Sequence, residues 1–457
     1  MSVKFNQLSN AIRFLSVDAV QKAKSGHPGM PMGMADVATV LFKYHLRFNP
    51  RNPNWINRDR FILSAGHGSM LLYSLLYLCG YKSVSIEDIK NFRQLNSICA
   101  GHPEYKEGSG IETTTGPLGQ GLGNAVGMAI AEEIFRKKFG SSLINNKTFV
   151  IASDGDLMEG VSHEAMSLAG HLKLKNLVVF FDNNKISIDG STSLSVSDNY
   201  KKRFESYNWE FLEINGHNEK QISKAISKAT KSNKPTIISC KTVIGFGSPN
   251  KSGKASSHGS PLGEEEITLV RKKLKWNHKP FEIPREILEE WKKIGDRGEQ
   301  LEEKWQELIN KKNSQIKNKL EKVFNNNELG DLENLIEKQK TKYFETKPNL
   351  ATRQCSMATI ESISSIFPQL IGGSADLSGS NNTKTNNSKI INSKNFDGNY
   401  IHYGVREHGM AAVMNGLALY GGIMPYGGTF LIFSDYCKPS IRLSALMGLK
   451  VIYIFSH

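Results

Sequence analysis

Two residues with oxygen-bearing side chains follow two apolar, β-branched runs of the chain. Asp154 comes shortly after residues 148–152, and Asn184 comes shortly after residues 177–181. Together with a nearby backbone carbonyl, they would form a set of hard oxygen ligands, which suits Mg²⁺ or Ca²⁺ and not zinc. A Mg²⁺ ion with so few protein ligands usually completes its coordination with water and phosphate oxygens. The pattern therefore indicates a divalent-cation site beside a phosphate group.

The chain between these two residues predicts how they come together. Residues 159–171 have helical spacing, so we expect a strand–helix–strand unit with two parallel strands. Asp154 and Asn184 would then lie at the carboxyl edge of the sheet, where open α/β sheets bind ligands. Gly155 lacks a Cβ and would let an anion approach the backbone. Ordinary turns are the alternative interpretation, but the βαβ spacing favours a cation and a diphosphate.

Three histidines, His27, His67 and His102, each occur in a loop that contains glycine. A structural role such as capping would explain any one of them taken alone. Imidazole exchanges a proton near neutral pH. Three such loops in one domain therefore indicate a site that moves protons.

A glycine-rich segment over residues 113–123 precedes a helix that we expect over residues 124–134. It departs from the dinucleotide-binding fingerprint, because Asn124 or Val126 stands where that motif requires its last glycine and no apolar strand precedes it. A glycine turn that opens a helix still presents backbone N–H groups. These suit an anion or the edge of an aminopyrimidine.

Length, charge and cysteine content narrow the class of protein. The 457 residues suffice for two large cores, and the net charge of +14 comes mostly from lysines in polar segments, which favours a solvated surface. The sequence contains no nucleic-acid motif and no run of transmembrane length, so we expect neither a nucleic-acid nor a membrane partner. The five cysteines are scattered, and the chain begins without an apolar leader. We therefore expect a cytoplasmic protein without disulfides or a zinc site.

The elements that would position these residues begin with a large first domain. We expect it over residues 1–330, including a solvated helical extension from about residue 264, and residues 331–348 would form a linker. The elements expected before the extension are a helix over 4–24, a strand over 61–64, a polar loop over 189–208, a strand over 235–243 and a flexible, lid-like loop over 245–259.

The second domain is expected over residues 349–457. Its predicted elements are a helix that Arg353 leads, a strand over 370–373, a mobile polar loop over 381–399, a helix from Glu407 to the glycines at 421–422, a helix beginning within 429–436 and a final strand near 451–457. Phe430, Phe433 and Tyr436 recur with a spacing that usually means core packing. Glu407 in a first turn would complement the helix dipole even without another role.

Taken together, these segments resemble the transketolase family over the whole chain. The resemblance rests on Asp154-Gly155 followed by Asn184, with Ser153 where the family usually has glycine. It rests also on the segments 25–29, 66–69, 101–103, 115–121, 257–259 and 403–407. It implies an α/β, thiamine diphosphate-binding fold, with parallel sheets flanked by helices in two domains. The first would hold the diphosphate and the second the pyrimidine. Family chains continue well beyond His457, so the second domain is expected to be incomplete.

The resemblance also implies an activity and a cofactor. A two-carbon ketol unit would pass from a ketose phosphate to an aldose phosphate through a thiamine diphosphate ylid, as in the pentose phosphate pathway. The divalent cation would be Mg²⁺, Ca²⁺ or Mn²⁺. Two alternatives remain, namely a truncated, non-catalytic fragment that binds cofactor or partner without turnover, and a related thiamine-dependent synthase.

The resemblance assigns roles to individual residues. The metal ligands would be Asp154, Asn184 and Ile186. The cofactor contacts would be His67, Gly116, Pro117, Leu118, Gly155, Asn184, His258 and Phe433. The substrate contacts would be His27, His102, His258, Arg353, Ser380 and His457. The catalytic residues would be Glu407, which would bond the aminopyrimidine ring, and His27 and His258.

The expected partners are sugar phosphate substrates and a second copy of the chain. In the implied homodimer the active sites lie at the subunit interface, Glu407 acts in trans, and Glu159 and Glu164 are interface acids that link the two sites. Lys185 stands where many relatives have glycine, which we expect to be a mild change because the neighbouring Ile186 carbonyl is the inferred ligand. The incomplete sheet of the second domain would leave an unpaired strand edge.

Overall fold

The computed structural model describes residues 3–324 and 330–456. The chain forms two compact units, which do not follow a single boundary along the sequence. The first unit comprises Met1–Leu122, Asn146–His163 and Lys175–Glu307, and the second comprises Gly123–Asn145, Glu164–Leu174 and Leu308–His457. No helix in the described ranges is long and apolar enough to cross a membrane.

Five strands of the first unit form one parallel sheet in the order β1-β2-β3-β7-β6. Their bounds are β1 (Arg60–Leu63), β2 (Thr148–Ala152), β3 (Leu177–Asp182), β6 (Glu210–Asn215) and β7 (Thr236–Lys241). Every residue of β2 and β3 is buried. This burial explains their continuous apolar runs, because a parallel sheet is covered on both faces.

The predicted strand–helix–strand unit is confirmed. β2 pairs with β3 in parallel, and α6 (Asp154–Met158) and α7 (Gly160–Leu172) connect them. α7 begins in the first unit and continues in the second. The carboxyl ends of β2 and β3 therefore meet at one edge of the sheet, as the hypothesis of a cation site requires.

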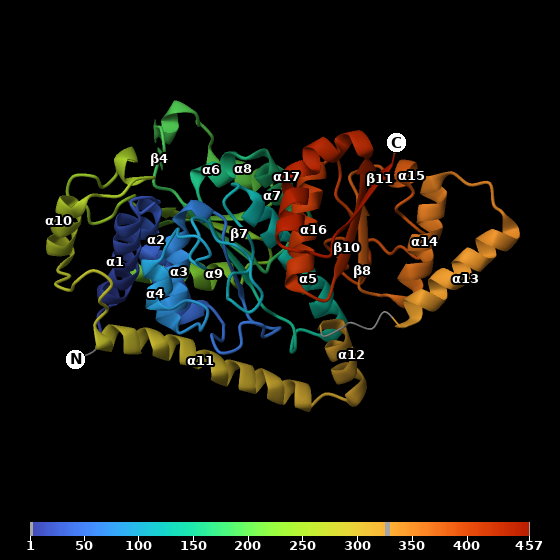
Figure 1. Ribbon diagram of the computed structural model, residues 1–457, viewed down its shortest axis with the longest axis horizontal. Helices are drawn as coiled ribbons and strands as arrows, with labels where there is room; N and C mark the ends of the chain where they lie inside the picture. Colours follow the sequence, from blue (N-terminus) through green and yellow to red (C-terminus); the bar gives the residue numbers. More distant parts are fainter. Residues whose placement is uncertain (1–2, 325–329, 457) are drawn as a thin grey trace. The chain divides into compact units, whose positions relative to one another are not determined.

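Helices α1 (Phe5–Ala23), α2 (Gly29–Val40) and α3 (Ser69–Cys79) of the first unit pack against one another (Figure 1). Shorter elements complete the unit. They are the π-helix η1 (Leu41–His45), the 3₁₀ turns η2 (Gly66–Gly68), η3 (Thr192–Leu194) and η4 (Ala255–Ser257), α4 (Ile86–Lys90), the antiparallel pair β4 (Ile186–Ser187) and β5 (Gly190–Ser191), α8 (Tyr200–Ser206) and α9 (Glu219–Ala229). The loop expected over 189–208 was therefore too long, because β5, η3 and α8 lie within it.

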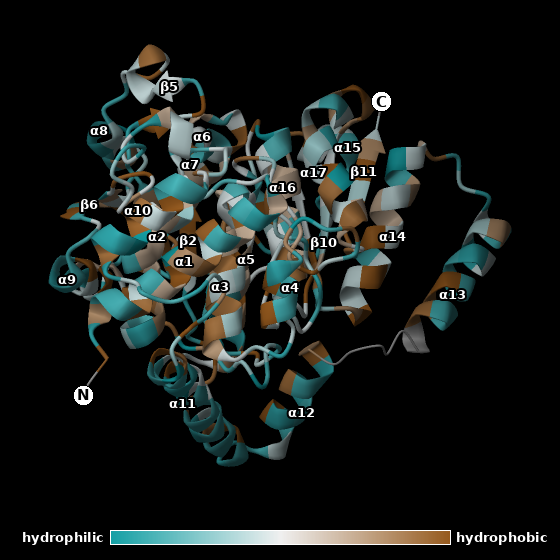
Figure 2. Ribbon diagram, turned by 60° about the vertical axis from the view of Figure 1, so that its left-hand side comes forward, coloured by the Kyte–Doolittle hydropathy of each residue, from teal (hydrophilic) through white to brown (hydrophobic). Residues whose placement is uncertain are grey.

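The helical extension consists of α10 (Glu264–Leu274) and α11 (Arg285–Asn310), followed by α12 (Ser314–Phe324) and α13 (Gly330–Thr346). Its helical character is confirmed, and α11 is largely hydrophilic (Figure 2). It is nevertheless not only a solvated face. The indole of Trp291 is fully buried and donates to the Leu8 carbonyl at 3.3 Å, and Trp305 packs edge-on against Trp55. The tryptophans anchor α11 to the first unit.

Four strands of the second unit form another parallel sheet in the order β11-β10-β8-β9. Its elements are β8 (Leu370–Ser374), β9 (Tyr400–His402), β10 (Met424–Phe430), β11 (Ile452–Ser456), α14 (Thr352–Ile366), α15 (Ser378–Asn381), α16 (Glu407–Tyr420), the 3₁₀ turn η5 (Leu431–Phe433) and α17 (Ser434–Leu446). α16 and α17 pack against each other (Figure 1). Among the described strands β11 pairs only with β10 and is an edge strand of this sheet.

Helix α5 (Gln120–Phe139) begins in the first unit, and from Gly123 onward it belongs to the second. There it crosses α16 at glycines. A Cβ added to Gly127 would overlap the Val413 carbonyl oxygen, and one added to Gly416 would overlap the Asn124 carbonyl oxygen. The two backbones approach this closely only because neither glycine has a side chain.

One expectation for the second domain was wrong. The segment over 381–399 is anchored rather than mobile: Thr383 and Phe396 are buried, and the Tyr426 hydroxyl donates to the Thr383 carbonyl at 2.9 Å. The helix expected to begin within 429–436 is confirmed, and it begins at Ser434 because the preceding residues complete β10 and η5.

The aromatic residues near η5 do not pack in a core, which is the usual meaning of their spacing. The rings of Phe430, Phe433 and Tyr436 contact one another, with centroids 5.9 Å apart in each successive pair. Tyr436 is 62% exposed, and no residue of η5 is buried. The three rings therefore form a surface cluster and not a core. The expected closure of α16 is confirmed, since Gly421 follows it with a φ of 92°.

Candidate cofactor and cation site

Asp154 lies where β2 passes into α6. Ser153 caps this helix: its hydroxyl accepts from the Asp156 N–H, and the Asp156 carboxylate accepts from the Ser153 N–H at 2.9 Å. Asp154 is the first helical residue and is only 4% exposed. Ser153 is therefore the capping residue of α6.

Asn184 lies just past β3 and makes two hydrogen bonds. Its Nδ2 donates to Asp182 Oδ2 at 2.8 Å, and its Oδ1 accepts from the Ile186 N–H at 2.9 Å. Lys185 between them has a φ of 67°, in the left-handed region. Such a conformation favours glycine, which explains why a lysine is unexpected at this position.

The site contains two neighbouring buried carboxyl groups. Burial raises the pKa of Asp154 to about 6, although the charge of Lys185 and the Tyr200 hydroxyl oppose the shift. Burial also raises the pKa of Asp182 to about 7, opposed by the Thr242 hydroxyl and increased by the neighbouring Asp154. Two carboxyl groups that resist ionisation in this way would be stabilised by a cation.

The donor set decides which cation fits. The described residues contain no group of three or more His, Cys, Asp or Glu side chains arranged to hold a metal. A cation at the ends of β2 and β3 would take oxygens from Asp154, Asn184 and the Ile186 carbonyl, and its remaining ligands from outside the protein. That arrangement fits Mg²⁺ or Ca²⁺ with a phosphate.

Asp156 joins three segments around this site, and the sequence analysis missed it. Its buried carboxylate accepts from Ser64 Oγ at 2.6 Å and from the Gly119 N–H at 2.9 Å, in addition to Ser153. It thus connects the end of β1, the glycine turn and the end of β2. The capping-box spacing of Ser153 and Asp156 was the only local signal.

The glycine turn lies against two of the histidine loops. A Cβ added to Gly66 would lie 2.5 Å from the Gly116 nitrogen, and one added to Gly116 would lie 3.1 Å from the His102 ring. Gly116 has a φ of 129°, which other residues rarely adopt. Pro117 and Leu118 follow in the same turn, and the Leu118 side chain is next to Gly155.

Four histidines from four loops converge in the first unit. The ring of His27 lies 5.2 Å from that of His67, 5.7 Å from His258 and 6.4 Å from His102, between centroids. His67 and His258 stack at 5.1 Å. The structure thus brings the three histidine loops expected from the sequence together and adds His258 as a fourth ring.

The histidine cluster is held in its neutral form. Burial lowers the pKa of His27 to about 4, helped by the charges of His258, Arg93 and His102. Burial likewise lowers the pKa of His67, His102 and His258. Within the described residues, the buried Nδ1 atoms of His27 and His258 have no hydrogen-bond partner. Neutral imidazoles with free ring nitrogens can bind and relay protons of a ligand.

The loop over 245–259 carries His258, and it is packed rather than flexible. The Gly245 N–H donates to the Gly29 carbonyl at 3.0 Å, and Ser257 is buried against Gly29. Glu266 accepts hydrogen bonds from the Ser248 hydroxyl and the Asn250 N–H. The expectation of a lid-like loop was therefore wrong, because backbone contacts hold the segment against the His27 loop.

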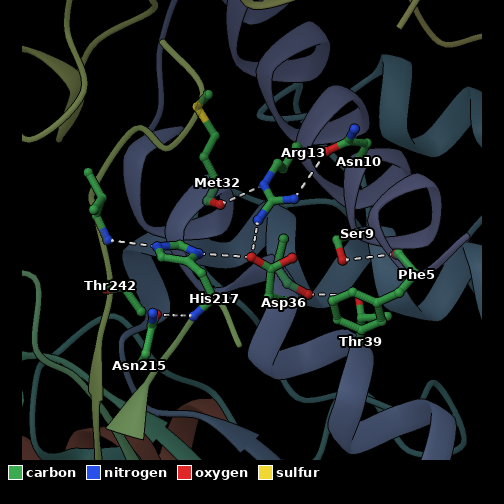
Figure 3. A network of polar contacts seen from close by, with 12 residues as sticks. Phe5, Ser9, Asn10, Arg13, Met32, Asp36, Thr39, Asn215, His217 and Thr242 are labelled. Atoms are coloured by element: carbon green, nitrogen blue, oxygen red, sulfur yellow. Dashed lines mark hydrogen bonds and ion pairs between the residues drawn. The ribbon is translucent and has the colours of Figure 1, made fainter. Parts of the chain in front are cut away.

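A buried ion-pair network supports the start of this loop (Figure 3). Arg13 on α1 pairs with Asp36 on α2 at 2.6 Å, and Asp36 Oδ2 also accepts from His217 Nδ1 at 2.8 Å. His217 Nε2 accepts from the Val243 N–H at 3.1 Å, so the ring proton is on Nδ1. The ring of Phe246 lies between the His217 ring, at 4.2 Å, and the Arg13 guanidinium, at 4.5 Å.

The other expected site residues lie in the second unit. Glu407 is buried at the start of α16, and its Oε1 accepts weakly from Thr429 Oγ1 at 3.4 Å. Glu164 Oε2 accepts from the Gly409 N–H at 2.6 Å. Burial raises the pKa of Glu164, and the charge of Glu407 raises it further, against the Gly409 hydrogen bond.

The remaining candidates occupy separate elements. Phe433 is half-buried in η5, Arg353 is half-buried in the first turn of α14, and Ser380 is exposed in α15. Glu159 is exposed in the first unit between α6 and α7. His457 lies outside the described residues.

Comparisons with known proteins match the chain to one family over nearly its whole length. The model for the transketolase thiamine diphosphate binding domain matches residues 5–330, and that for the transketolase pyrimidine binding domain matches residues 348–457. The chain is 51% identical over 450 residues to a transketolase of Sinorhizobium medicae, covering 98% of this chain and 64% of that protein. It is 52% identical over 459 residues to a transketolase of Buchnera aphidicola, covering 99% and 69%.

Solved structures give the same result. The transketolase of Campylobacter jejuni superposes with a TM-score of 0.92 at 42% identity, covering 100% of this chain and 70% of that one. The transketolase of Leishmania mexicana superposes with a TM-score of 0.90 at 38% identity, covering 100% and 69%. The chain thus spans 64% of the length of one curated relative and 69% of the other.

Proposed function

The chain belongs to the transketolase family, and from this membership we propose that it transfers a two-carbon ketol unit from a ketose phosphate to an aldose phosphate. The observation that carries the proposal is the convergence of four neutral histidines in the unit that also holds Asp154 and the glycine turn. A sugar phosphate brings several hydroxyl groups, and proton exchange with them is the chemistry that neutral imidazoles offer.

Thiamine diphosphate and a divalent cation would bind in the first unit. Asp154, the Asn184 side chain and the Ile186 carbonyl would hold the cation. His67, Gly155, His258 and the Gly116-Pro117-Leu118 turn would contact the cofactor. When bound, thiamine diphosphate supplies a nucleophilic carbon and an electron sink for carbon–carbon bond cleavage. In the second unit, Phe433 and Glu407 would contact the pyrimidine ring, Glu407 by a hydrogen bond to a ring nitrogen.

The substrate would be held by its hydroxyl and phosphate groups. His27, His102 and His258 would contact the reacting hydroxyls. The Nδ1 atoms of His27 and His258, which have no hydrogen-bond partner among the described residues, could exchange a proton with them. Arg353, Ser380 and His457 would bind the phosphate. The guanidinium fork of Arg353 suits that group.

The protein would act as a homodimer in the cytoplasm. Its active sites would lie at the subunit interface, with Glu407 acting in trans and Glu159 and Glu164 between the two sites. The location is supported by the five cysteines, all of which are free thiols.

A turnover assay tests the activity. The purified chain is incubated with a ketose phosphate and an aldose phosphate, together with thiamine diphosphate and Mg²⁺, and the product sugars are measured. We expect turnover that requires both the cofactor and the cation. Calorimetric titration with thiamine diphosphate is run in parallel. Cofactor binding without turnover would show a non-catalytic fragment instead, and loss of both would overturn the proposal.

A further inference from the structure

Arg93 lies in a constrained turn beside the histidine cluster, and the proposed function gives it no role. Its backbone has a φ of 63°, in the left-handed region that non-glycine residues seldom adopt. The Arg93 N–H donates to the Cys99 carbonyl at 2.9 Å, which closes the turn after α4. Backbone strain of this kind persists only where the surrounding structure enforces it.

The side chain of Arg93 contacts two of the four histidine loops. Its Nη1 donates to Ser25 Oγ at 2.5 Å, two residues before His27. Its Nε packs against Gly101, where an added Cβ would lie only 3.0 Å away, next to His102. The guanidinium therefore fixes both loops.

The neighbouring Phe92 strengthens this arrangement. A Cβ on Gly26 would lie 2.9 Å from Phe92 Cε1, so the His27 loop packs directly on that ring. Gly26 has a φ of 131°, which excludes most other residues. Phe92 and Arg93 together define where the His27 loop lies.

The charge of Arg93 acts on the same two histidines. The guanidinium is bonded to the neutral Ser25 hydroxyl, so its charge is not cancelled by that contact. It lowers the pKa of His102, second only to burial, and it lowers the pKa of His27 together with burial and the rings of His258 and His102. The groups that face His27 are thus His67, His102, His258 and Arg93.

We propose that Arg93 is a positioning residue that fixes the His27 and His102 loops and keeps both imidazoles neutral. The inference deepens the proposed function, and rests on it only for the use of the two histidines on a sugar hydroxyl. It assigns Arg93 an electrostatic task in addition to a structural one. Removing the charge while keeping the hydrogen bond should therefore have a measurable effect.

The test is a histidine titration by nuclear magnetic resonance on the full chain labelled at histidine Cε1, without cofactor. Arg93→Gln removes the charge and keeps a donor for Ser25, Arg93→Lys keeps the charge, and Ser25→Ala removes only the hydrogen bond. We expect Arg93→Gln to raise the titration midpoints of His27 and His102 by roughly one unit, while Arg93→Lys and Ser25→Ala leave them near those of the parent chain. His45, which lies outside the cluster and whose pKa is lowered by burial and Arg297, is the internal control.

Unchanged midpoints in Arg93→Gln would overturn the proposal, as would equal shifts in Arg93→Gln and Arg93→Lys. If Arg93→Gln does not fold, Arg93→Met, which removes the charge and the donor together, is compared with Ser25→Ala, which removes the hydrogen bond alone. In the cofactor-loaded protein, the acidic limb of the kcat/KM profile should move to higher pH in the uncharged variants only. The titration needs neither cofactor nor turnover, so the histidine midpoints can be measured even if the chain has no transferase activity.

Discussion

At the scale of single residues, the molecule buries titratable groups that most proteins keep in water. Burial lowers the pKa of the His27 imidazole to about 4 and raises the pKa of the Asp154 carboxyl to about 6, so each group resists its charged form. Such groups destabilise the folded chain unless a ligand compensates for them, and for that reason they gather at functional sites.

Acid should destabilise the chain through His27. Its pKa is about 4 in the folded state against an ordinary value of 6.5, so between these pH values the unfolded chain binds a proton that the folded chain does not. The stability of the folded chain is therefore unaffected by this group above pH 6.5, and the free energy of unfolding falls as the pH is lowered from 6.5 to 4. Allowing for partial exposure of the ring, we expect a loss of about 1–2 kcal/mol. Urea unfolding at several pH values should show a smaller loss in His27→Gln, and an identical loss would contradict the assignment.

Cofactor binding should depend on Asp154 and Asn184. Asp154→Ala or Asn184→Ala removes an oxygen ligand and should weaken thiamine diphosphate binding in the presence of Mg²⁺ by roughly 10–100-fold or more. Calorimetry measures this, and chelation of the metal should produce the same loss in the parent chain. Asp189→Ala, an exposed aspartate in the neighbouring hairpin, is the matched control. Undiminished binding in a folded Asp154→Ala/Asn184→Ala double variant would refute the cation site.

At the scale of elements, buried polar contacts and glycine crossings set how helices meet loops and one another. The network of Arg13, Asp36 and His217 joins α1 and α2 to the loop that carries His258 (Figure 3). The crossing of α5 and α16 relies on absent side chains instead. Both features join residues that are far apart in the sequence. Their contribution to stability can be measured by substituting one of the residues involved.

Removing a residue of the buried network should lower the free energy of unfolding far more than removing a residue of a surface ion pair. Asp36→Ala leaves Arg13, 2% exposed, and His217 without their shared carboxylate, and should lower the free energy of unfolding by about 3–5 kcal/mol. Arg51 and Glu299 form a comparable pair at 57% and 47% exposure, and Glu299→Ala should change it by less than about 1 kcal/mol. Urea unfolding compares the two variants, and similar losses would show that the network is not structural.

A methyl group at the α5–α16 crossing should separate the two helices. Gly416→Ala places a Cβ on the Asn124 carbonyl oxygen and should destabilise the second unit by about 1–3 kcal/mol or more. Gly379→Ala, where an added Cβ would meet nothing within 4 Å, should change stability by less than about 0.5 kcal/mol. Thermal unfolding followed by circular dichroism distinguishes them. Equal melting temperatures would mean that the helices adjust without strain.

At the scale of the whole molecule, each unit has its own parallel sheet, and the second presents exposed apolar groups. Leu431 and Ile432 are 61% and 69% exposed on η5. Adjacent large apolar side chains at such exposure are typical of an association surface. They support the proposed homodimer.

Self-association should therefore depend on η5. Ile432→Lys places a charge on this surface and should weaken dimerisation at least about tenfold, which corresponds to about 1.4 kcal/mol. Analytical ultracentrifugation over a range of concentrations measures the effect. Leu95→Lys, at a side chain 93% exposed in the first unit, is the control. An unchanged dimer in Ile432→Lys, or a parent chain that stays monomeric, would exclude this surface.

Local patterns predicted much of the fold and part of the site. The βαβ unit, and with it the placing of Asp154 and Asn184 at one sheet edge, follows from buried strands and helical spacing, which are properties of neighbouring residues. The wrong predictions concerned segments that are held in place by residues far away in the sequence. The polar segment at 381–399 is held by Tyr426, and the loop at 245–259 by Gly29.

By itself, the sequence determined the parallel α/β architecture, the glycine loops that present histidines and the family to which the chain belongs. Only the tertiary structure decided that four imidazoles share one cluster, that Asp156 joins three segments of the chain and that Arg93 contacts the His27 and His102 loops. Asp36 and His217 are 181 positions apart, and Ser64 and Asp156 are 92 apart. Contacts over such separations produce no repeating pattern in the sequence. They form only when the packed sheet brings remote chain segments within hydrogen-bonding distance.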